Sequence, residues 1–204
     1  MLLAIDTSSL VLSCALAEKN RLISEWTVQR KLTHSEQLIP HLDNMMKDAG
    51  VSREEITAVA CSLGPGSFTG LRIGLASIKM MACIWDVPLI GVDTLEALAW
   101  NMAGGEAYAL PIMDAQRGNV YAALYSVHGS EVIKEEQETV ISIDELTEKV
   151  SGLSVPVTAL GEAADKYADK LTEAGITLAP PAIRCCRAGS VSSVSFQAGR
   201  VPEI

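Results

Sequence analysis

Apolar residues in the first half of the chain fall into short runs, and polar or turn-forming residues separate these runs. Continuous or alternating apolar runs of five to nine residues predict strands, whereas apolar residues at a spacing of three and four predict helices. The expected order is three strands, helix, strand, helix, strand, helix, at residues 2–8, 11–17, 21–28, 35–50, 57–63, 69–85, 88–92 and 94–102.

Gly104-Gly105 marks a boundary, and after it the pattern begins again. Strands are expected at 107–113, 119–126, 131–140 and 156–160, and helices at 144–150 and 162–174. Three strands that lead into alternating helices and strands, used twice, are the plan of the actin-like (ribonuclease H-like) fold. We therefore predict an α/β protein with a duplicated actin-like fold. Its two subdomains, 1–103 and 104–204, would each hold a mixed sheet flanked by helices.

The expected helix over 69–85 is apolar on more than one face. At 100° per residue its inward arc is formed by Leu71, Leu75, Ile78 and Ala82. A second stripe of mainly small residues comprises Gly70, Gly74, Ser77 and Met81, and it lies beside Ile73, Met80 and Ile84. Only Arg72 and Lys79 keep a narrow polar edge. The helix over 35–50 offers a companion side, lined by Leu38, Leu42, Met45, Met46 and Ala49. A helix that is apolar on two faces needs cover on both, and the pattern leaves open whether the second cover is a neighbouring element or another chain.

Composition limits the kinds of partner. The net charge is −9, and no basic run supplies the Lys/Arg footprint that direct binding of RNA requires, so any role with nucleic acid is expected to be indirect. Five scattered cysteines are typical of a reduced, cytosolic protein. No uninterrupted apolar stretch reaches the roughly 18 residues of a membrane span. The first residues, MLLAIDTSS, predict a strand rather than a signal peptide.

Two aspartates stand where an actin-like protein would approach a nucleotide phosphate. Asp6 ends the first apolar run, and Asp114 opens the segment DAQRGNVY. A carboxylate there can hold a Mg²⁺-bound water, although aspartate also caps turns through its own side chain. The loop GPGSFTGLRIG at 64–74 lacks the Lys-Ser/Thr of a Walker loop, and Gly161 is at best a remnant of an adenosine-binding segment. We treat both aspartates as vestigial candidates, with an actin-like ATPase or kinase as the alternative function.

The histidines do not have the spacing of a metal site. His34 and His41 are seven residues apart, about 10 Å along a helix, whereas a zinc pair needs the i, i+4 spacing. His128 is distant in sequence, and neither a G-x-S-x-G elbow nor a recognisable Cys–His pair occurs. We therefore expect no catalytic residue, no metal and no cofactor, and a binding role instead.

Four segments in order, AIDTS, HSEQLIPHL, GPGSFTGLRIG and DAQRGNVYAALY, resemble the motifs of the TsaB (YeaZ-type) family, which is glycoprotease-like by older grouping. The resemblance implies a cytoplasmic, non-catalytic scaffold in the synthesis of tRNA threonylcarbamoyladenosine. Such a scaffold binds and activates TsaD, which transfers the threonylcarbamoyl group to the adenosine next to the anticodon, together with TsaE, a small ATPase. It also implies a homodimer when TsaD is absent, contact with tRNA only through the complex, and no membrane.

The resemblance further implies that the helices over 35–50 and 69–85 build the partner surface. Its expected residues are Leu38, Leu42, Met45, Gly70, Ile73, Gly74, Ser77, Met80, Met81 and Ile84. The substitution Gly74→Arg is then expected to break association and to leave the monomer folded. The C-terminal end departs from the family pattern, because residues 182–200 fit poorly and the chain stops at Ile204 without the usual Pro-containing segment. A truncated or divergent tail is expected there.

Overall fold

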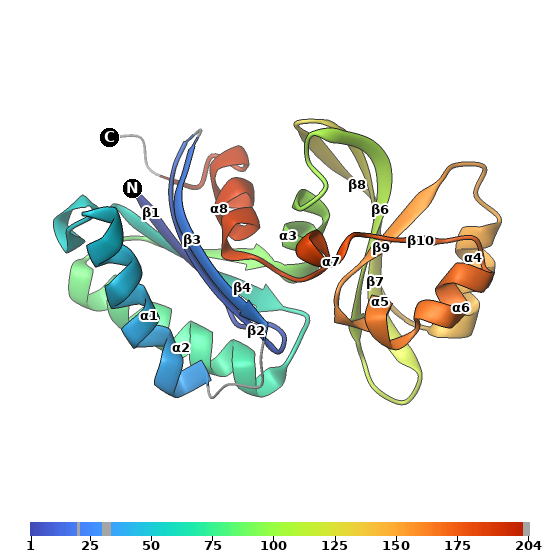
Figure 1. Cartoon of the computed structure of the whole chain (residues 1–204), viewed down its shortest axis with the longest axis horizontal. Helices are drawn as coiled ribbons and strands as arrows, with labels where there is room; N and C mark the ends of the chain where they lie inside the picture. Colours follow the sequence, from blue (N-terminus) through green and yellow to red (C-terminus); the bar gives the residue numbers. More distant parts are fainter. Residues whose placement is uncertain (20, 30–33, 202–204) are drawn as a thin grey trace. The chain divides into compact units, whose positions relative to one another are not determined.

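Two mixed sheets with helices packed on them form the molecule (Figure 1). The computed structural model describes residues 1–19, 21–29 and 34–201. The strand order is β3-β2-β1-β4-β5 in the first sheet and β10-β9-β6-β7-β8 in the second. Each sheet has a central strand that pairs antiparallel with the next strand of the chain and parallel with a later one. The prediction of a duplicated actin-like α/β fold is confirmed.

The first sheet surrounds a central strand that is buried along its whole length. Its elements are β1 (Leu2–Asp6), β2 (Val11–Glu18), β3 (Arg21–Gln29), α1 (His34–Ala49), η1 (Arg53–Glu55), β4 (Ala58–Gly64), α2 (Phe68–Trp85), β5 (Leu89–Asp93) and α3 (Thr94–Trp100). Ile5 of β1 lies opposite Cys14 of β2 on one side and Cys61 of β4 on the other. These side chains pack under α1 and α2, and because side chains alternate along a strand, Leu2 and Ala4 face the opposite side of the sheet.

The second sheet repeats this plan with longer hairpin strands. Its elements are β6 (Gly105–Asp114), β7 (Asn119–Gly129), β8 (Glu131–Ser142), α4 (Ile143–Ser151), β9 (Val157–Leu160), α5 (Glu162–Lys166), α6 (Ala168–Glu173), β10 (Thr177–Leu178) and α7 (Pro181–Arg184). The single helix expected over 162–174 is divided at Tyr167 into α5 and α6. Apolar residues of β6, β7, α4 and α6 make the core of this unit.

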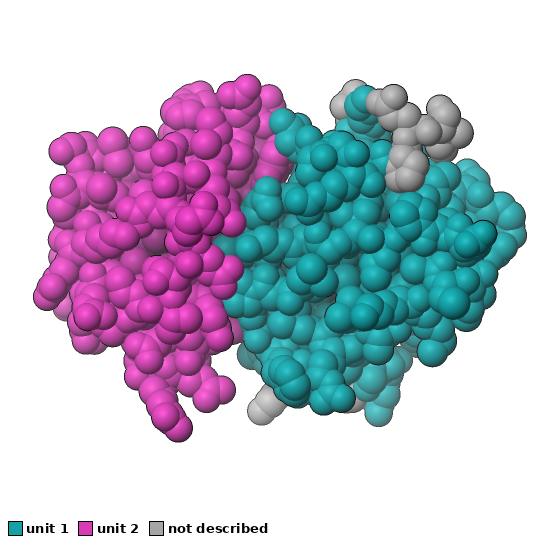
Figure 2. Space-filling model, turned by 180° about the vertical axis from the view of Figure 1, so that it is seen from behind, with its two compact units in different colours: residues 1–97, 186–204 teal, residues 98–185 magenta. Residues whose placement is uncertain are grey.

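The chain divides into two compact units that differ from the expected subdomains 1–103 and 104–204. The first unit contains residues 1–97 and 186–204, and the second contains residues 98–185 (Figure 2). The difference is the C-terminal segment, which returns to the first unit as α8 (Ala188–Gln197). This helix covers the face of the first sheet that α1 and α2 leave bare, and it therefore completes the burial of β1 (Figure 1).

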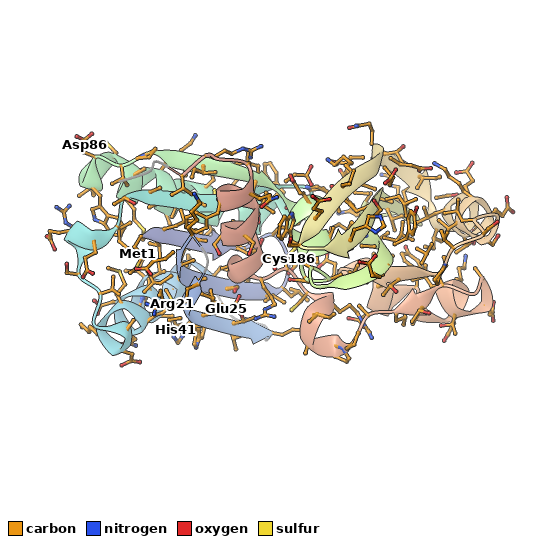
Figure 3. All side chains as sticks on the ribbon, turned by 90° about the horizontal axis from the view of Figure 1, so that it is seen from above. Met1, Arg21, Glu25, His41, Asp86 and Cys186 are labelled. Carbon is orange, nitrogen blue, oxygen red and sulfur yellow. The ribbon has the colours of Figure 1, made fainter. Side chains whose placement is uncertain are left out.

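A largely buried glutamate on β3 anchors α8. Glu25 Oε1 accepts a hydrogen bond from the Gly189 N–H at 2.8 Å, and Oε2 accepts one from Arg187 Nε at 3.1 Å (Figure 3). The Ala188 N–H donates to Ser13 Oγ of β2 at 2.9 Å. The first amides of a helix have no partner within the helix, so these acceptors on the sheet cap its N-terminus.

Residues 182–200 contain several serines, which are unusual in a buried helix. Inside α8 the buried hydroxyls form hydrogen bonds with backbone carbonyls of the same helix. Ser192 Oγ donates to Gly189 O at 2.6 Å, and Ser195 Oγ donates to Val191 O at 2.8 Å. A buried hydroxyl without a partner would be unfavourable, and these bonds remove that penalty. The segment that fits the family pattern poorly is thus an ordinary core helix in the structure.

Candidate functional site

The helix α2 packs on the first sheet with one side only. Ser67 caps its N-terminus by accepting a hydrogen bond from the Gly70 N–H at 3.2 Å. Gly70, Gly74 and Ile78 are buried against the sheet and its preceding turn. The other side carries large apolar residues in solvent: Phe68 is 74% exposed, Met80 65% and Ile84 67%.

The exposed residues of α2, together with the half-exposed Ile73 and Ser77 next to them, occupy about half of the helix circumference at 100° per residue. They are Phe68, Thr69, Arg72, Ile73, Ala76, Ser77, Lys79, Met80, Cys83 and Ile84. We call this surface the open half of α2. An apolar helix face of this width is normally covered, and no described part of the chain covers it.

The open half has three zones with different chemistry. Small residues, Thr69, Ala76 and Cys83, lie along its middle and permit another helix to approach closely. Ile73, Met80 and Ile84 form an apolar edge. Arg72 and Lys79 form a basic edge, where the Arg72 guanidinium lies 5.3 Å from the centre of the Phe68 ring. A small centre, one apolar edge and one charged edge are suited to binding a protein surface in a defined orientation.

By length and composition alone, α2 is also the one helix in the described part of the chain that could cross a membrane. In the structure, however, the side that carries Gly70, Gly74 and Ile78 lies against a folded sheet. The basic edge of Arg72 and Lys79 further interrupts the apolar surface. A protein partner therefore matches the open half better than a lipid environment does.

The glycines of the GPGSFTGLRIG loop allow α2 to approach the turn after β1. A Cβ atom on Gly66 would lie 2.2 Å from the Ser8 carbonyl oxygen, and one on Gly70 would lie 2.1 Å from the Thr7 carbonyl oxygen. A Cβ atom on Gly74 would lie 2.2 Å from Thr7 Oγ1, which itself donates to Gly70 O at 2.9 Å. These three glycines are needed for packing inside the chain.

Five of the ten expected interface residues face the chain's own core, which corrects the sequence-based surface. Gly70 and Gly74 lie against Thr7, so Gly74→Arg would disturb the monomer and cannot test association alone. The other three, Leu38, Leu42 and Met45, belong to α1 and are buried on the side of it that faces the sheet. The remaining five, Ile73, Ser77, Met80, Met81 and Ile84, are at least partly exposed and stay candidates.

Sequence reasoning identified Arg72 and Lys79 as a narrow polar edge of this helix, but it missed the middle of the open half. Ala76 and Cys83 are exposed there, together with Phe68 at the start of the helix. The helical angles contain part of this information, because Ala76 and Cys83 fall on the arc opposite Ile78, whereas Phe68 lies at one end of the open half. The inward arc expected from the sequence does pack on the core through Leu75, Ile78 and Ala82, but the sequence did not show that Gly70 and Gly74 of the second stripe also face inward.

Asp6 lies in a fully buried cluster of hydroxyl groups. Its Oδ1 accepts hydrogen bonds from the Ser8 N–H at 3.2 Å and from Ser8 Oγ at 3.0 Å, and its Oδ2 accepts one from Ser62 Oγ. Burial raises the pKa of the Asp6 carboxyl above its ordinary value, although the hydroxyls of Ser62 and Ser8 partly oppose this effect. Asp6 thus ties β1, its following turn and β4 together, and its oxygens are not open to a hydrated metal ion.

Asp114 lies in the second unit and is neutralised there. Lys166 Nζ of α5 donates to both of its oxygens, each at 2.9 Å, and the Gln116 N–H donates to Oδ1 at 3.1 Å. The hydrogen bonds that Lys166 donates to Asp114 raise the pKa of Lys166. The two vestigial candidates therefore belong to different units, and each has its own internal partners.

The histidines have separate local roles. His41 stacks on Trp26 of β3 with ring centres 3.6 Å apart, and its Nε2 lies 3.1 Å from Gln37 Oε1 (Figure 3). His34 Nε2 lies 3.3 Å from the Val11 carbonyl oxygen, and His128 Nδ1 lies 2.9 Å from Glu106 Oε2. Within residues 1–19, 21–29 and 34–201, no three His, Cys, Asp or Glu side chains gather as a metal site would require.

Comparison with known proteins identifies the family to which the chain is related. The family model described as "TsaD: tRNA N6-adenosine threonylcarbamoyltransferase" matches residues 28–197. The chain is 30% identical over 181 residues to the tRNA threonylcarbamoyladenosine biosynthesis protein TsaB of Escherichia coli, which covers 87% of this chain and 78% of that protein. It is 36% identical over 124 residues to the TsaB of Bacillus subtilis. This match covers 61% of this chain and about half, 54%, of that relative.

Solved structures agree with the fold. YeaZ from Pseudomonas aeruginosa superposes with a TM-score of 0.78 at 23% identity, over 99% of this chain and 94% of that one. Component A of the (R)-2-hydroxyglutaryl-CoA dehydratase of Acidaminococcus fermentans superposes with a TM-score of 0.57 at 9% identity, over 98% of each chain.

The fold and the open half of α2 together define a class: an actin-like protein of two repeated α/β units, in which one helix leaves an apolar side exposed. Its two phosphate-side aspartates are enclosed by their own neighbours. Within that class, the chain belongs to the TsaB (YeaZ-type) family.

Proposed function

We propose that this chain is the non-catalytic scaffold subunit of the machinery that makes tRNA threonylcarbamoyladenosine. In this role it binds TsaD through the open half of α2 and, together with TsaE, brings TsaD into its active arrangement. Family membership supports the pathway, because the Escherichia coli and Bacillus subtilis relatives are named as biosynthesis proteins for this modification. The contact with tRNA would be made by the partner, since the chain has a net charge of −9.

The observation that carries the proposal is the exposure of an apolar helix face. Phe68, Met80 and Ile84 each leave most of their side chain in water, at a cost that burial against a partner would recover. Fully burying a side chain of this size contributes about 1.5–3 kcal/mol, so the three together would make a large contribution to association.

The state of the two aspartates supports a non-catalytic role. An actin-like ATPase or kinase would need carboxylates that can reach a hydrated Mg²⁺ ion. Asp6 is enclosed by Ser8 and Ser62, and Asp114 is paired with Lys166. Calorimetry with Mg-ATP tests this part of the proposal, and tight binding by the isolated chain would favour the enzyme alternative.

The same surface would pair two copies of the chain when TsaD is absent. The basic edge of α2 contains Arg72 and Lys79, whereas the exposed side of α1 carries Glu36, Asp43 and Asp48, with Lys47 already paired to Asp43 at 2.6 Å. Opposite charges on neighbouring helices favour a two-fold arrangement in which α2 of one copy lies against α1 of the other.

The test is Met80→Lys, which places a charge on the apolar edge without touching the core of the first unit. An unpaired charge in an interface costs several kcal/mol, so we expect binding to TsaD to weaken by at least about 100-fold. Threonylcarbamoyl transfer to tRNA, reconstituted with TsaD and TsaE, should fall in parallel.

The matched control is Val140→Lys, which adds the same charge at an exposed apolar residue of β8 in the second unit. It should bind TsaD like the wild type. Both variants should keep the wild-type unfolding temperature within about 2 °C, because both sites are exposed. Equal binding by Met80→Lys and wild type would remove the open half of α2 as the docking surface.

A further inference from the structure

The hairpin between β6 and β7 holds two ordinary residues in a backbone conformation that usually requires glycine. Gln116, Arg117 and Gly118 have φ values of 65°, 53° and 82°. The turn is closed by hydrogen bonds from the Ala115 N–H to Asn119 O at 3.0 Å and from the Asn119 N–H to Gln116 O at 2.9 Å. Tight hairpin turns of this kind favour Asn, Asp or Gly, because other side chains are strained there.

Arg117 also differs from the other cations of its unit in having no partner. The second unit, whose residues 98–185 are all described, contains six Lys and Arg residues. Four are in ion pairs and one lies over an aromatic ring: Lys149 with Glu136, Lys166 with Asp114, Lys170 with Asp144, Arg184 with Asp165, and Lys134 above Tyr125. Arg117 is exposed, and no hydrogen bond, ion pair or ring contact engages it in this part of the chain.

Strain and an unused charge coincide at Arg117. A strained residue persists only when the surrounding structure imposes it, and such residues gather at functional sites. Asparagine at this position would relieve the strain, so the arginine side chain itself does not serve the stability of the turn. A guanidinium group binds an oxyanion through two parallel hydrogen bonds.

We propose that Arg117 binds a carboxylate of a partner protein in the assembled modification complex, at a site separate from the open half of α2. The charge of the second unit selects a carboxylate over a nucleic-acid backbone. This unit carries thirteen acidic and six basic residues, so it repels a polyanion but tolerates a single acidic side chain. The proposal rests on the proposed function for the identity of the complex.

The experiment uses the full chain and three variants in the presence of TsaD and TsaE. Arg117→Asn removes the charge and relieves the strain, Gln116→Asn relieves strain next to it and keeps the charge, and Arg117→Lys keeps both a charge and the strain. The measurements are the unfolding temperature of the chain alone and its affinity for the TsaD–TsaE mixture at low and high salt.

We expect Arg117→Asn to raise the unfolding temperature by about 2–4 °C and to weaken binding by about tenfold or more at low salt. Gln116→Asn should raise the unfolding temperature and bind like the wild type. Arg117→Lys should bind with intermediate affinity, because an ammonium group cannot form the paired contact. A merely structural role would not combine a gain in stability with a loss of binding.

The proposal would be overturned if the Arg117→Asn variant bound TsaD and TsaE with the affinity of the wild type. A loss that occurs only when tRNA is added would also overturn it, because Arg117 would then contact nucleic acid. If the wild type itself fails to bind TsaD and TsaE, the proposed function falls. If the wild type binds them and the Arg117→Asn variant binds them equally well, only the proposal for Arg117 falls.

Discussion

Asp6 occupies a position that could bind a nucleotide in an actin-like fold, but its neighbours give it a structural role. It ends β1, where a carboxylate could face a nucleotide phosphate, but its oxygens are bound by Ser8 and Ser62. No lysine or arginine contacts it in the described part of the chain. The hydrogen bonds from Ser62 and Ser8 and the more distant charge of His34 favour its ionised form, but burial outweighs them and raises its pKa. The carboxyl group therefore holds its proton more tightly in the folded chain than in the unfolded chain.

The pH dependence of stability tests this state. Since the folded pKa of Asp6 lies above the unfolded value of 3.8, its contribution is most favourable below that value and is lost as pH rises through the folded pKa. We expect the free energy of unfolding of the wild type, relative to Asp6→Asn, to fall as pH rises from about 4 to 8.

Urea unfolding of both proteins at several pH values provides the measurement. The amide keeps the shape of the side chain and cannot ionise, so it serves as its own pH-independent reference. Parallel stability profiles for the two proteins would show that Asp6 has an ordinary pKa in the folded chain.

At the residue scale, sequence reasoning found positions more reliably than roles. It selected Asp6 and Asp114 as candidates, but the partners that enclose them, Ser62 and Lys166, are 56 and 52 positions away and carry no local signal. It also assigned Gly74 to a partner surface, since a small residue in a helix is compatible both with close packing inside the chain and with an interface. Only the position of Thr7 decides between these two.

The elements up to β9 follow the hydrophobic pattern closely, whereas α8 could not have been assigned to its sheet. Helix α2 was expected over 69–85 and spans Phe68–Trp85, and α1 was expected over 35–50 and spans His34–Ala49. The Ser/Val composition of α8 has weak amphipathic character, and its anchor, Glu25, is 164 positions from Gly189. Long-range pairing of this kind is set by tertiary packing and leaves no periodic pattern.

At the element scale, Glu25 should decide whether α8 stays on its sheet. Glu25→Ala removes the acceptor of the Gly189 N–H and leaves the Arg187 guanidinium without its carboxylate. Breaking a partly buried pair of this kind is expected to cost about 1–3 kcal/mol, less than a fully buried pair would cost. Hydrogen exchange of the amides of 188–197 should accelerate more than that of the second unit.

Glu18→Ala is the matched control, because Glu18 lies on the neighbouring strand β2 and its pair with Arg21, at 3.6 Å, is exposed. An exposed pair contributes about 0–1 kcal/mol, so this variant should resemble the wild type. Equal protection of α8 in the wild type and in Glu25→Ala would show that apolar packing alone holds the helix.

For the whole molecule, the duplicated plan was predictable because each half repeats the order of a hairpin followed by alternating helices and strands. The division of the chain was not, since the repeat ends before α8 and nothing in residues 186–204 indicates which sheet they rejoin. The expected subdomain boundaries therefore match the repeated order of strands and helices. The observed unit boundaries instead depend on which hydrophobic core each segment packs against.

Self-association of the whole molecule should depend on ionic strength if α2 of one copy meets α1 of another. Salt screens the attraction between Arg72 and Lys79 on one helix and the exposed acidic residues of the other. We expect the dimer dissociation constant to rise several-fold between about 0.05 M and 0.5 M salt, as measured by analytical ultracentrifugation.

Lys79→Glu reverses one charge of the basic edge and should weaken the dimer most at low salt. The variant and the wild type should converge as salt increases. Tighter association at high salt would instead indicate a purely apolar contact between copies.

The return of α8 to the first sheet has a consequence for the order of events during synthesis. Residues 1–97 emerge from the ribosome with one face of β1 uncovered, and the covering helix ends at Gln197, after the whole second unit has been made. The second unit, which is continuous in the chain, can therefore mature before the first. Until then, the first unit exposes two apolar surfaces: the face of its sheet that α8 later covers, and the open half of α2, which stays exposed in the complete chain.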